Sequence, residues 1–249
     1  MMEQRITGRK NPFLQQVRRL LRSKKERQET GLFVADGTKL LEEAIKWWPG
    51  LDTVILSDGV EMDIPEKTRL VRVPEDIMAW ISPMETPQGA LFLCRLPQKK
   101  PFAPQPGMLF LDGIQDPGNL GTILRTADAL DIPVALLEGC ADPYSHKVVR
   151  ASMGAVFRRP VMQTTWEEAK ASCEKKNIPI AVTAMDAQAV DLRQADINAC
   201  TVVIGSEGQG VRQEIIDTAR QKLIIPMHQR CESLNAAIAA AIVMWQMKQ

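Results

Sequence analysis

The sequence has few of the residues that build disulfide frameworks and zinc sites. It contains only two histidines and five cysteines. The cysteines are odd in number and widely spaced, at Cys94, Cys140, Cys173, Cys200 and Cys231, and no CxxC pair occurs. A disulfide-stabilised protein and a zinc site are therefore both disfavoured, and we expect no bound metal.

Long apolar runs are also missing. The most apolar stretch, residues 236–245, has about half of the ~20 residues that a bilayer span needs. The amino terminus has no apolar core of the kind found in secretory signals. Together with the cysteine content, these absences lead us to expect a soluble protein of the reducing cytoplasm, without a membrane partner.

The nucleotide-binding loops with the best-known glycine patterns are absent as well. Residues 202–211 read Val-Val-Ile-Gly-Ser-Glu-Gly-Gln-Gly-Val, which is GxxGxG and not the GxGxxG of dinucleotide binders. No lysine follows as in a P-loop, so an NAD-dependent oxidoreductase is a weak alternative. Three glycines directly after an apolar strand still let the backbone approach a ligand closely, although a tight turn before a helix would also explain them.

The chain is long enough for one large domain or two ordinary ones, with 249 residues of which 45% are hydrophobic. Four prolines fall within residues 97–107, and such a stretch predicts an extended linker. We therefore predict a first domain at residues 1–96, a linker at 97–106 and a second domain at 107–249.

The expected elements differ between the two domains. In the first, helices are predicted at 12–27 and 39–48, and strands at 31–37, 54–56, 70–73 and 90–93. In the second, strands at 108–111, 134–137, 180–183, 201–204 and 223–225 alternate with helices at 119–130, 146–153, 166–174, 212–219 and 235–247. This alternation predicts an α/β domain with a parallel sheet covered on both faces, and ligands bind beyond the carboxyl ends of such strands.

Positive charge is concentrated at the start of the chain. Residues 1–27 hold nine Lys/Arg against two Glu, a net charge of +7, so the other 222 residues carry −6 of the total of +1. Such a segment indicates contact with a polyanion, although a solvated basic helix is the alternative. The cations that we assign to RNA binding are Arg9, Lys10, Arg18, Arg22, Lys24 and Lys25.

Three polar segments of the second domain are candidates for chemistry. In residues 111–127, a helix start followed by Arg125 suits a phosphate and its ribose, although a capped helix with a solvated arginine is the alternative. Residues 202–211 are the glycine-rich segment. In residues 224–239, a strand leads through a polar loop to an alanine-rich helix, and Ser233 could simply cap that helix. Cys231 lacks a partner base and is a weak candidate for a nucleophile.

In this order and spacing, the three segments resemble the SpoU/TrmH family of RNA ribose methyltransferases, within the SPOUT class. The resemblance rests on Asn119-x-Gly-x-x-x-Arg125-Thr-Ala, on Ile204-Gly-Ser-Glu-Gly-x-Gly210, and on Ile225-Pro-Met227 followed by Ser233-Leu-Asn235. The segment 147–154 also resembles the family, and the first domain loosely resembles the ribosomal-protein-like RNA-binding domain that often precedes this fold. Two departures are Asp36, where the family commonly has Glu, and Ala236-Ala237, which replace Val-Ser.

The resemblance implies a trefoil-knotted sheet domain, a homodimer with its site at the interface, and S-adenosylmethionine as cofactor. It implies that cofactor contacts come from Thr183, Gly205, Ile225, Met227 and Leu234. It makes Arg125 the group that activates or positions the ribose 2′-hydroxyl, with Asn119, Glu207, Ser233 and Asn235 in support. The expected substrate is ribosomal RNA of the large subunit, by analogy only. Transfer RNA, or a catalytically silent RNA-binding protein on the same fold, are the alternatives.

Overall fold

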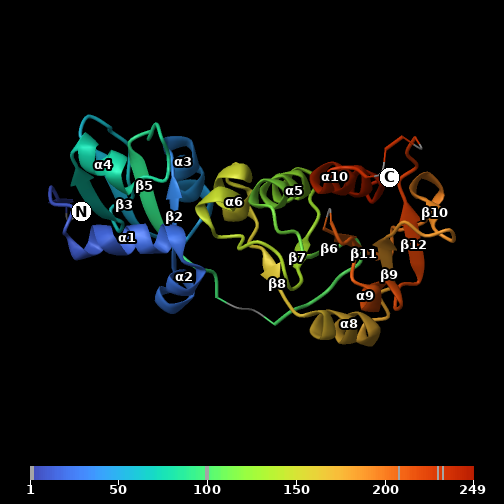
Figure 1. Cartoon of the computed structure of the whole chain (residues 1–249). Coiled ribbons are helices and arrows are strands. Elements are labelled where there is room, and N and C mark those ends of the chain that lie inside the picture. Colours follow the sequence, from blue (N-terminus) through green and yellow to red (C-terminus); the bar gives the residue numbers. More distant parts are fainter. Residues whose placement is uncertain (1–2, 99–100, 207, 229, 232) are drawn as a thin grey trace. The chain divides into compact units, whose positions relative to one another are not determined.

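The computed structural model describes residues 3–98, 101–206, 208–228, 230–231 and 233–249, and its contacts divide the chain into two units (Figure 1). Unit 1 contains Met1–Gln98 together with Tyr144–Pro160, and unit 2 contains Lys99–Pro143 and Val161–Gln249. Unit 1 therefore includes a segment that lies well beyond the proline-rich stretch in the sequence. The predicted domains at 1–96, for RNA binding, and at 107–249, for methyl transfer, stay a prediction.

Unit 1 is built on a five-stranded sheet in the order β1-β4-β3-β5-β2. Strands β1, β4 and β3 are parallel to one another, and β5 is antiparallel to both β3 and β2. The strands are β1 (Glu3–Arg5), β2 (Leu32–Asp36), β3 (Leu51–Ser57), β4 (Arg69–Val73) and β5 (Ala90–Arg95). The helices are α1 (Pro12–Arg22), α2 (Lys24–Thr30), α3 (Thr38–Trp47), α4 (Glu75–Ile81), α6 (His146–Ala151) and α7 (Ala155–Arg158).

The single helix predicted over residues 12–27 is two helices, because Ser23 interrupts it. Ser23 has extended backbone angles, and its hydroxyl accepts a hydrogen bond from the Glu26 N–H at 3.2 Å. A serine that bonds to nearby backbone in this way favours a helix start over a helix interior. Strand β1 was not predicted, because its three residues are all exposed and leave no apolar pattern.

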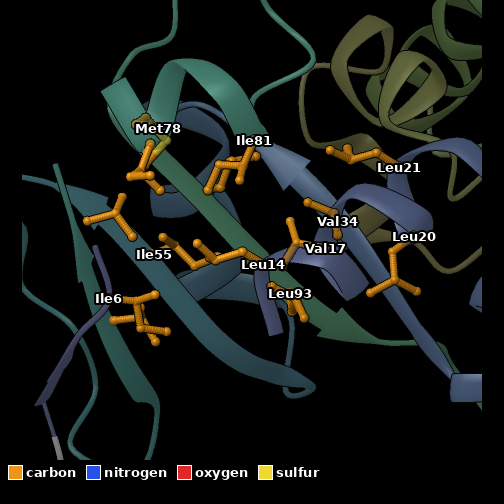
Figure 2. Packing of buried hydrophobic residues seen from close by; sticks show 14 residues of the cluster. Ile6, Leu14, Val17, Leu20, Leu21, Val34, Ile55, Met78, Ile81 and Leu93 are labelled. Atoms are coloured by element: carbon orange, nitrogen blue, oxygen red, sulfur yellow. The ribbon is translucent and has the colours of Figure 1, made fainter. Parts of the chain in front are cut away.

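One face of the unit 1 sheet is covered by α1 and α4. Figure 2 shows the apolar side chains of these two helices packed on those of the strands. The buried positions of α1 recur at the spacing of a single helix face. They are Leu14, Val17, Leu20 and Leu21.

The opposite face of the same sheet carries a cluster of aromatic rings. Successive strand residues point to opposite faces, so Phe33 and Phe92 point away from the core of Figure 2. Phe157 of α7 packs on Phe33 and Phe92 with ring centroids 6.2 and 5.9 Å apart, and Tyr144 lies 5.0 Å from Phe33. Residues 144–160 are thus part of the core of unit 1.

Unit 2 is built on a seven-stranded sheet in the order β10-β12-β9-β11-β6-β7-β8, with all neighbouring strands parallel. The strands are β6 (Leu109–Asp112), β7 (Val134–Leu136), β8 (Met162–Gln163), β9 (Ile180–Thr183), β10 (Val190–Asp191), β11 (Thr201–Gly205) and β12 (Gln221–Ile224). The helices are α5 (Pro117–Ala129), α8 (Trp166–Lys175), α9 (Gln213–Ile216), α10 (Ala236–Gln246) and the 3-10 turn η1 (Leu192–Gln194). The predicted parallel α/β sheet is confirmed, and the knot stays a prediction.

The helices of unit 2 form two layers around its sheet (Figure 1). Trp166 and Cys173 of α8 pack with Phe110 and Val203 in one core. Leu109, the strand neighbour of Phe110, points to the other face, where α5 and α10 pack against each other. This pairing brings together the helices that follow the first and third motifs.

The starts of α5 and α10 differ from the sequence predictions. Asp116 caps α5 by accepting a hydrogen bond from the Asn119 N–H at 2.8 Å, and a proline follows the cap, which is a strong start signal. Asn235 caps α10, because its Oδ1 accepts from the N–H groups of Ala237 and Ile238 at 2.9 and 3.3 Å. The alternative in which Ser233 is the cap was therefore wrong.

None of the helices in the parts of the chain that the structure describes is long and apolar enough to cross a membrane. Within those same residues, no group of three or more His, Cys, Asp or Glu side chains could hold a metal ion.

Candidate functional site

The three sequence motifs follow strands that end at one edge of the unit 2 sheet. Strand β6 ends at Asp112, β11 ends at Gly205, and β12 ends at Ile224. These strands and β9 are parallel, so the loops after them meet at the carboxyl edge, where ligands of such sheets bind. The predicted cofactor residues therefore come from neighbouring loops.

The first and third motifs line one pocket, with a volume of about 790 Å³. Arg125 of α5 and Ile225, directly after β12, both contribute to its wall. Arg125 is exposed, and it makes no hydrogen bond or ion pair with any residue that the structure describes. Its guanidinium is therefore available to a phosphate or a sugar oxygen, which it can bind with several donors.

Asn119 and Asn235 join the same two motifs by a direct hydrogen bond. The Asn235 Nδ2 donates to the Asn119 Oδ1 at 2.9 Å. Ser233 and Asn235 were predicted to support Arg125, but neither side chain is hydrogen-bonded to its guanidinium in the structure. Ser233 is exposed, and the predicted catalytic residue Glu207 lies outside the described residues.

Gly205 is required for a close approach of the chain to itself. A Cβ atom at this position would lie 2.0 Å from the carbonyl carbon of Gly210 and 2.2 Å from the nitrogen of Val211. The turn is closed by a hydrogen bond from the Gly210 N–H to the Ser206 carbonyl at 2.9 Å. The expected close approach at Gly205 is thus made by the protein's own backbone, and the glycine shapes the loop that borders the site.

The other predicted cofactor residues lie on neighbouring strand ends and loops. The Thr183 hydroxyl donates to the Val203 carbonyl at 3.3 Å, between β9 and β11. Met227 and Leu234 are half-buried in the stretch 225–235, whose described residues form no helix or strand. The described main-chain groups of residues 225–228 and 233–234 are therefore not part of a helix or a strand.

Arg212 ties the glycine-rich loop to the sheet, a role that the sequence analysis missed. Its backbone N–H and Nε donate to the two carboxylate oxygens of Asp112 at 2.9 and 2.8 Å, and Asp112 is only 2% exposed. The guanidinium also reaches Glu138 at 2.8 Å and Glu214 at 3.0 Å. Burial acts to raise the pKa of Glu138, but hydrogen bonds from its own backbone, the Trp166 N–H and Arg212 leave that pKa below its usual value.

The sequence held one signal for the Asp112–Arg212 contact. Asp112 ends an apolar strand, and Arg212 directly follows the glycine-rich segment. Two residues 100 positions apart cannot be paired from one sequence. The contact became visible only when the sheet order placed β6 beside β11.

The six cations assigned to RNA binding have different surroundings in unit 1. Arg9 pairs with Asp76 at 3.3 Å, and Lys25 pairs with Glu29 at 3.7 Å. The Arg18 guanidinium lies 4.3 Å from the centre of the Trp80 ring. The remaining three are exposed and have no partner among the described residues: Lys10, Arg22 and Lys24.

Comparison with known proteins identifies the family. Residues 106–245 match the SpoU rRNA Methylase family, and residues 11–91 match the MRM3-like substrate binding domain. This chain belongs to the SpoU rRNA methylase family. A relative from Bacillus subtilis (strain 168), the 23S rRNA (guanosine(2553)-2′-O)-methyltransferase RlmP, is 31% identical over 232 residues, which cover 92% of this chain and 93% of the relative. The predicted family and enzyme class are confirmed.

Two solved structures resemble this SpoU methylase over nearly its whole length. An rRNA methyltransferase from Sinorhizobium meliloti with AdoMet bound is 29% identical, with a TM-score of 0.86 and coverage of 99% of this chain and 97% of that one. A putative RNA methyltransferase of the TrmH family from Porphyromonas gingivalis is 32% identical, with a TM-score of 0.84 and coverage of 94% and 96%. The predicted class, a SPOUT methyltransferase domain preceded by a substrate-binding domain, is confirmed.

Proposed function

We propose that this SpoU methylase transfers the methyl group of S-adenosylmethionine to a ribose 2′-hydroxyl of large-subunit ribosomal RNA. The observation that carries the proposal is the position of Arg125, which is exposed, has no partner among the described residues, and lines a pocket together with the third motif. An arginine there can hold a phosphate and the neighbouring sugar, which every nucleotide of RNA contains. The name of the Bacillus relative supports 23S ribosomal RNA as the substrate.

The carboxyl edge of the sheet fits a cofactor held by main-chain groups. Gly205, Ile225 and Leu234 would supply backbone contacts from three loops, with Thr183 and Met227 beside them. Gly205 and the Arg212–Asp112 pair keep the second of these loops in place. When bound, S-adenosylmethionine supplies a methyl group that its sulfonium has already activated.

Arg125 acts on the other reactant, the ribose. An arginine stays protonated in a protein, so it is a poor base. We assign it to fixing the adjacent phosphate and stabilising the negative charge that develops on the 2′-oxygen as its proton leaves. Asn119 and Asn235 position α5 against α10, and through them the helix that carries Arg125.

The exposed apolar face of α10 supports a homodimer. Ile238, Ile242 and Trp245 are 52%, 40% and 62% exposed, and their spacing places them on one side of the helix. Ile242 and Trp245 also line the pocket that holds Arg125. A second copy of the chain on this face would bury these side chains and complete the wall around the site. We place the enzyme in the cytoplasm, where ribosomal RNA is modified.

The test is to identify the product. Ribosomal RNA and transfer RNA from a strain lacking this protein are incubated separately with the enzyme and methyl-labelled cofactor, then hydrolysed in alkali. A 2′-O-methyl group blocks cleavage at the next phosphate, so we expect the label in alkali-resistant dinucleotides of the 23S RNA. Label in ordinary mononucleotides would mean base methylation. Label only in transfer RNA would reject the ribosomal substrate, and no label in either RNA would favour a silent RNA-binding protein.

A further inference from the structure

A hollow of about 380 Å³ lies in unit 1, and none of the residues assigned to methyl transfer lines it. One wall is the stretch after α4, residues Pro83–Thr86, and the other is α6. The α6 residues that line it are His146, Lys147 and Arg150. Such a volume lies within the range of small-ligand pockets, about 300–1,000 Å³, and is large enough to admit a nucleotide unit.

The two walls come from different parts of the sequence. Residues 83–86 lie inside the match to the substrate-binding domain, whereas α6 lies inside the match to the methylase family. Helix α6 nevertheless belongs to unit 1, where Val148 and Val149 are fully buried. A surface of the substrate-binding unit is therefore completed by a helix from the methylase sequence.

The charged side chains of α6 are left open to the solvent. Lys147 is exposed and makes no hydrogen bond or ion pair with any residue that the structure describes. Arg150 is exposed too; its NH1 contacts the Met84 sulfur, and its charge also acts on the carboxylate of Asp36. Glu85 is the acidic residue of the lining, so the hollow keeps a net positive charge from its two cations. Burial, together with Lys147 and other cations, lowers the pKa of His146, which leaves the positive charge to Lys147 and Arg150.

Further cations border the hollow. His146 is hydrogen-bonded to the backbone of Leu21, which sets α6 beside the carboxyl end of α1. Arg22, the last residue of α1, is exposed. Arg18 stacks on Trp80 of α4, three residues before the other wall begins at Pro83. Cations with an interleaved aromatic ring suit the phosphates and bases of RNA.

We propose that this hollow binds the sugar-phosphate backbone of the substrate RNA, with Lys147 and Arg150 as the phosphate contacts. The inference rests on the proposed function, in that RNA is the substrate. It adds that the RNA-binding surface extends beyond residues 11–91 and includes α6. Neither residue is among those assigned to the cofactor or to the pocket of Arg125, so we expect their loss to act on RNA affinity alone.

The experiment compares charge removal on two helices of unit 1 in the full-length protein. The α6 variants are Lys147→Glu and the double variant Lys147→Gln/Arg150→Gln. The matched controls are Lys39→Glu and Lys39→Gln/Lys46→Gln on α3, whose two lysines are equally exposed. Filter binding measures affinity for a 23S rRNA transcript and for bulk transfer RNA over a range of salt. Calorimetry measures S-adenosylmethionine affinity, and melting temperature checks the fold.

We expect the α6 variants to bind RNA about tenfold more weakly, and the salt slope of the double variant to fall by about 1.5, since each phosphate contact contributes about 0.7–0.9. Cofactor affinity and melting temperature should not change, and the α3 controls should match wild type. Lys147→Glu keeps the test valid if loss of Arg150 disturbs the fold, because Lys147 has no partner among the described residues. Equal RNA binding by α6 and α3 variants, with methyl transfer intact, would overturn this inference alone. A wild-type protein that binds neither RNA would overturn the proposed function with it.

Discussion

Asn235 donates a hydrogen bond from its Nδ2 to the Oδ1 of Asn119 at 2.9 Å, across 116 residues of sequence. The Oδ1 of the same side chain caps α10 through two main-chain N–H groups. One amide therefore fixes the start of α10 and also the first turn of α5. The first and third motifs of the family are thus joined by a contact that is independent of any ligand.

Substitutions at Asn235 should separate its two contacts. Serine caps helices about as well as asparagine but is too short to reach Asn119, whereas alanine loses both contacts, at about 1 kcal/mol for the cap. We expect Asn235→Ser to melt somewhat below wild type, because the bond to Asn119 is lost, and Asn235→Ala to melt lower still, because the cap is lost as well. Both should transfer methyl roughly fivefold more slowly, since one hydrogen bond contributes about 1 kcal/mol. Thermal melts and single-turnover rates measure the two effects. A serine variant with the wild-type rate would reduce Asn235 to a cap.

The sequence predicted the sheet of unit 2 well because its long strands are apolar and buried. Strands β6, β9 and β11 lie within one or two residues of their predicted bounds. The two-residue strands β8 and β10 leave too little pattern to be recognised. The starts of α5 and α10 differ from their predicted positions because capping depends on single side chains, here Asp116 and Asn235. Several other polar residues nearby could equally have been the cap.

Contacts between distant segments were beyond the sequence. The motifs assigned Arg125 to the ribose and Ile225 to the cofactor, but they did not predict that both residues line one pocket. The link between Asp112 and Arg212 and the place of residues 144–160 in unit 1 depend on sheet order and on the burial of Tyr144 and Phe157. Neither the sheet order nor the burial of these residues can be derived from the hydrophobic periodicity of a single sequence.

Two glycines of one loop should respond differently to the same substitution. A Cβ at Gly205 would overlap the backbone of Gly210, whereas a Cβ at Gly208 would meet nothing within 4 Å. We expect Gly205→Ala to move the loop, lower the stability by about 1–3 kcal/mol as overpacking does, and weaken S-adenosylmethionine binding. Gly208→Ala should match wild type in both. Calorimetry and thermal melts test this, and equal cofactor affinity in the two variants would remove Gly205 from the site.

The apolar face of α10 should control the oligomeric state. Trp245 is 62% exposed beside Ile242, whereas Trp47 of α3 is 48% exposed in unit 1. A glutamate in a dimer interface leaves a buried, unpaired charge, which is strongly destabilising. We therefore expect Trp245→Glu to sediment as a monomer, and Trp47→Glu to sediment with the wild-type mass. Sedimentation at several concentrations measures this, and an unchanged mass for Trp245→Glu would place the interface elsewhere.

The cysteines should differ in reactivity and in their effect at high pH. Burial raises the pKa of the Cys140 thiol from about 9 to about 11, whereas Cys231 is exposed. Iodoacetamide at pH 8 should label Cys231 and spare Cys140, because the thiolate is the reactive form. Cys231→Ser should keep methyl transfer, since the Cys231 thiol has no hydrogen bond to a base among the described residues.

The sign of the pH effect follows from the proton balance at Cys140. Between pH 9 and 11 the unfolded chain releases this proton while the folded protein retains it. The free energy of unfolding must therefore fall as the pH rises through that window. Cys140→Ala should make the fall shallower. Denaturant titrations at several pH values measure the slope, and identical slopes for wild type and Cys140→Ala would contradict the assignment.

Arg125 should be needed for methyl transfer and dispensable for cofactor binding. It lies on α5, whereas the residues assigned to S-adenosylmethionine lie on other strands and loops, and it makes no hydrogen bond or ion pair with any described residue whose loss would unfold the protein. Removing a donor that stabilises developing charge slows an enzyme about 10²–10³-fold. Arg125→Ala should therefore lose transfer to that extent, with the wild-type Kd for the cofactor. Arg125→Lys keeps the positive charge but cannot make the bidentate hydrogen bonds of a guanidinium, so it should recover only part of the rate.

The control is Arg220→Ala, because Arg220 is exposed just before β12, at the opposite end of that strand from the site. Single-turnover transfer to 23S RNA and calorimetry separate the two effects. A transfer rate above a tenth of wild type in Arg125→Ala would show that another group activates the hydroxyl.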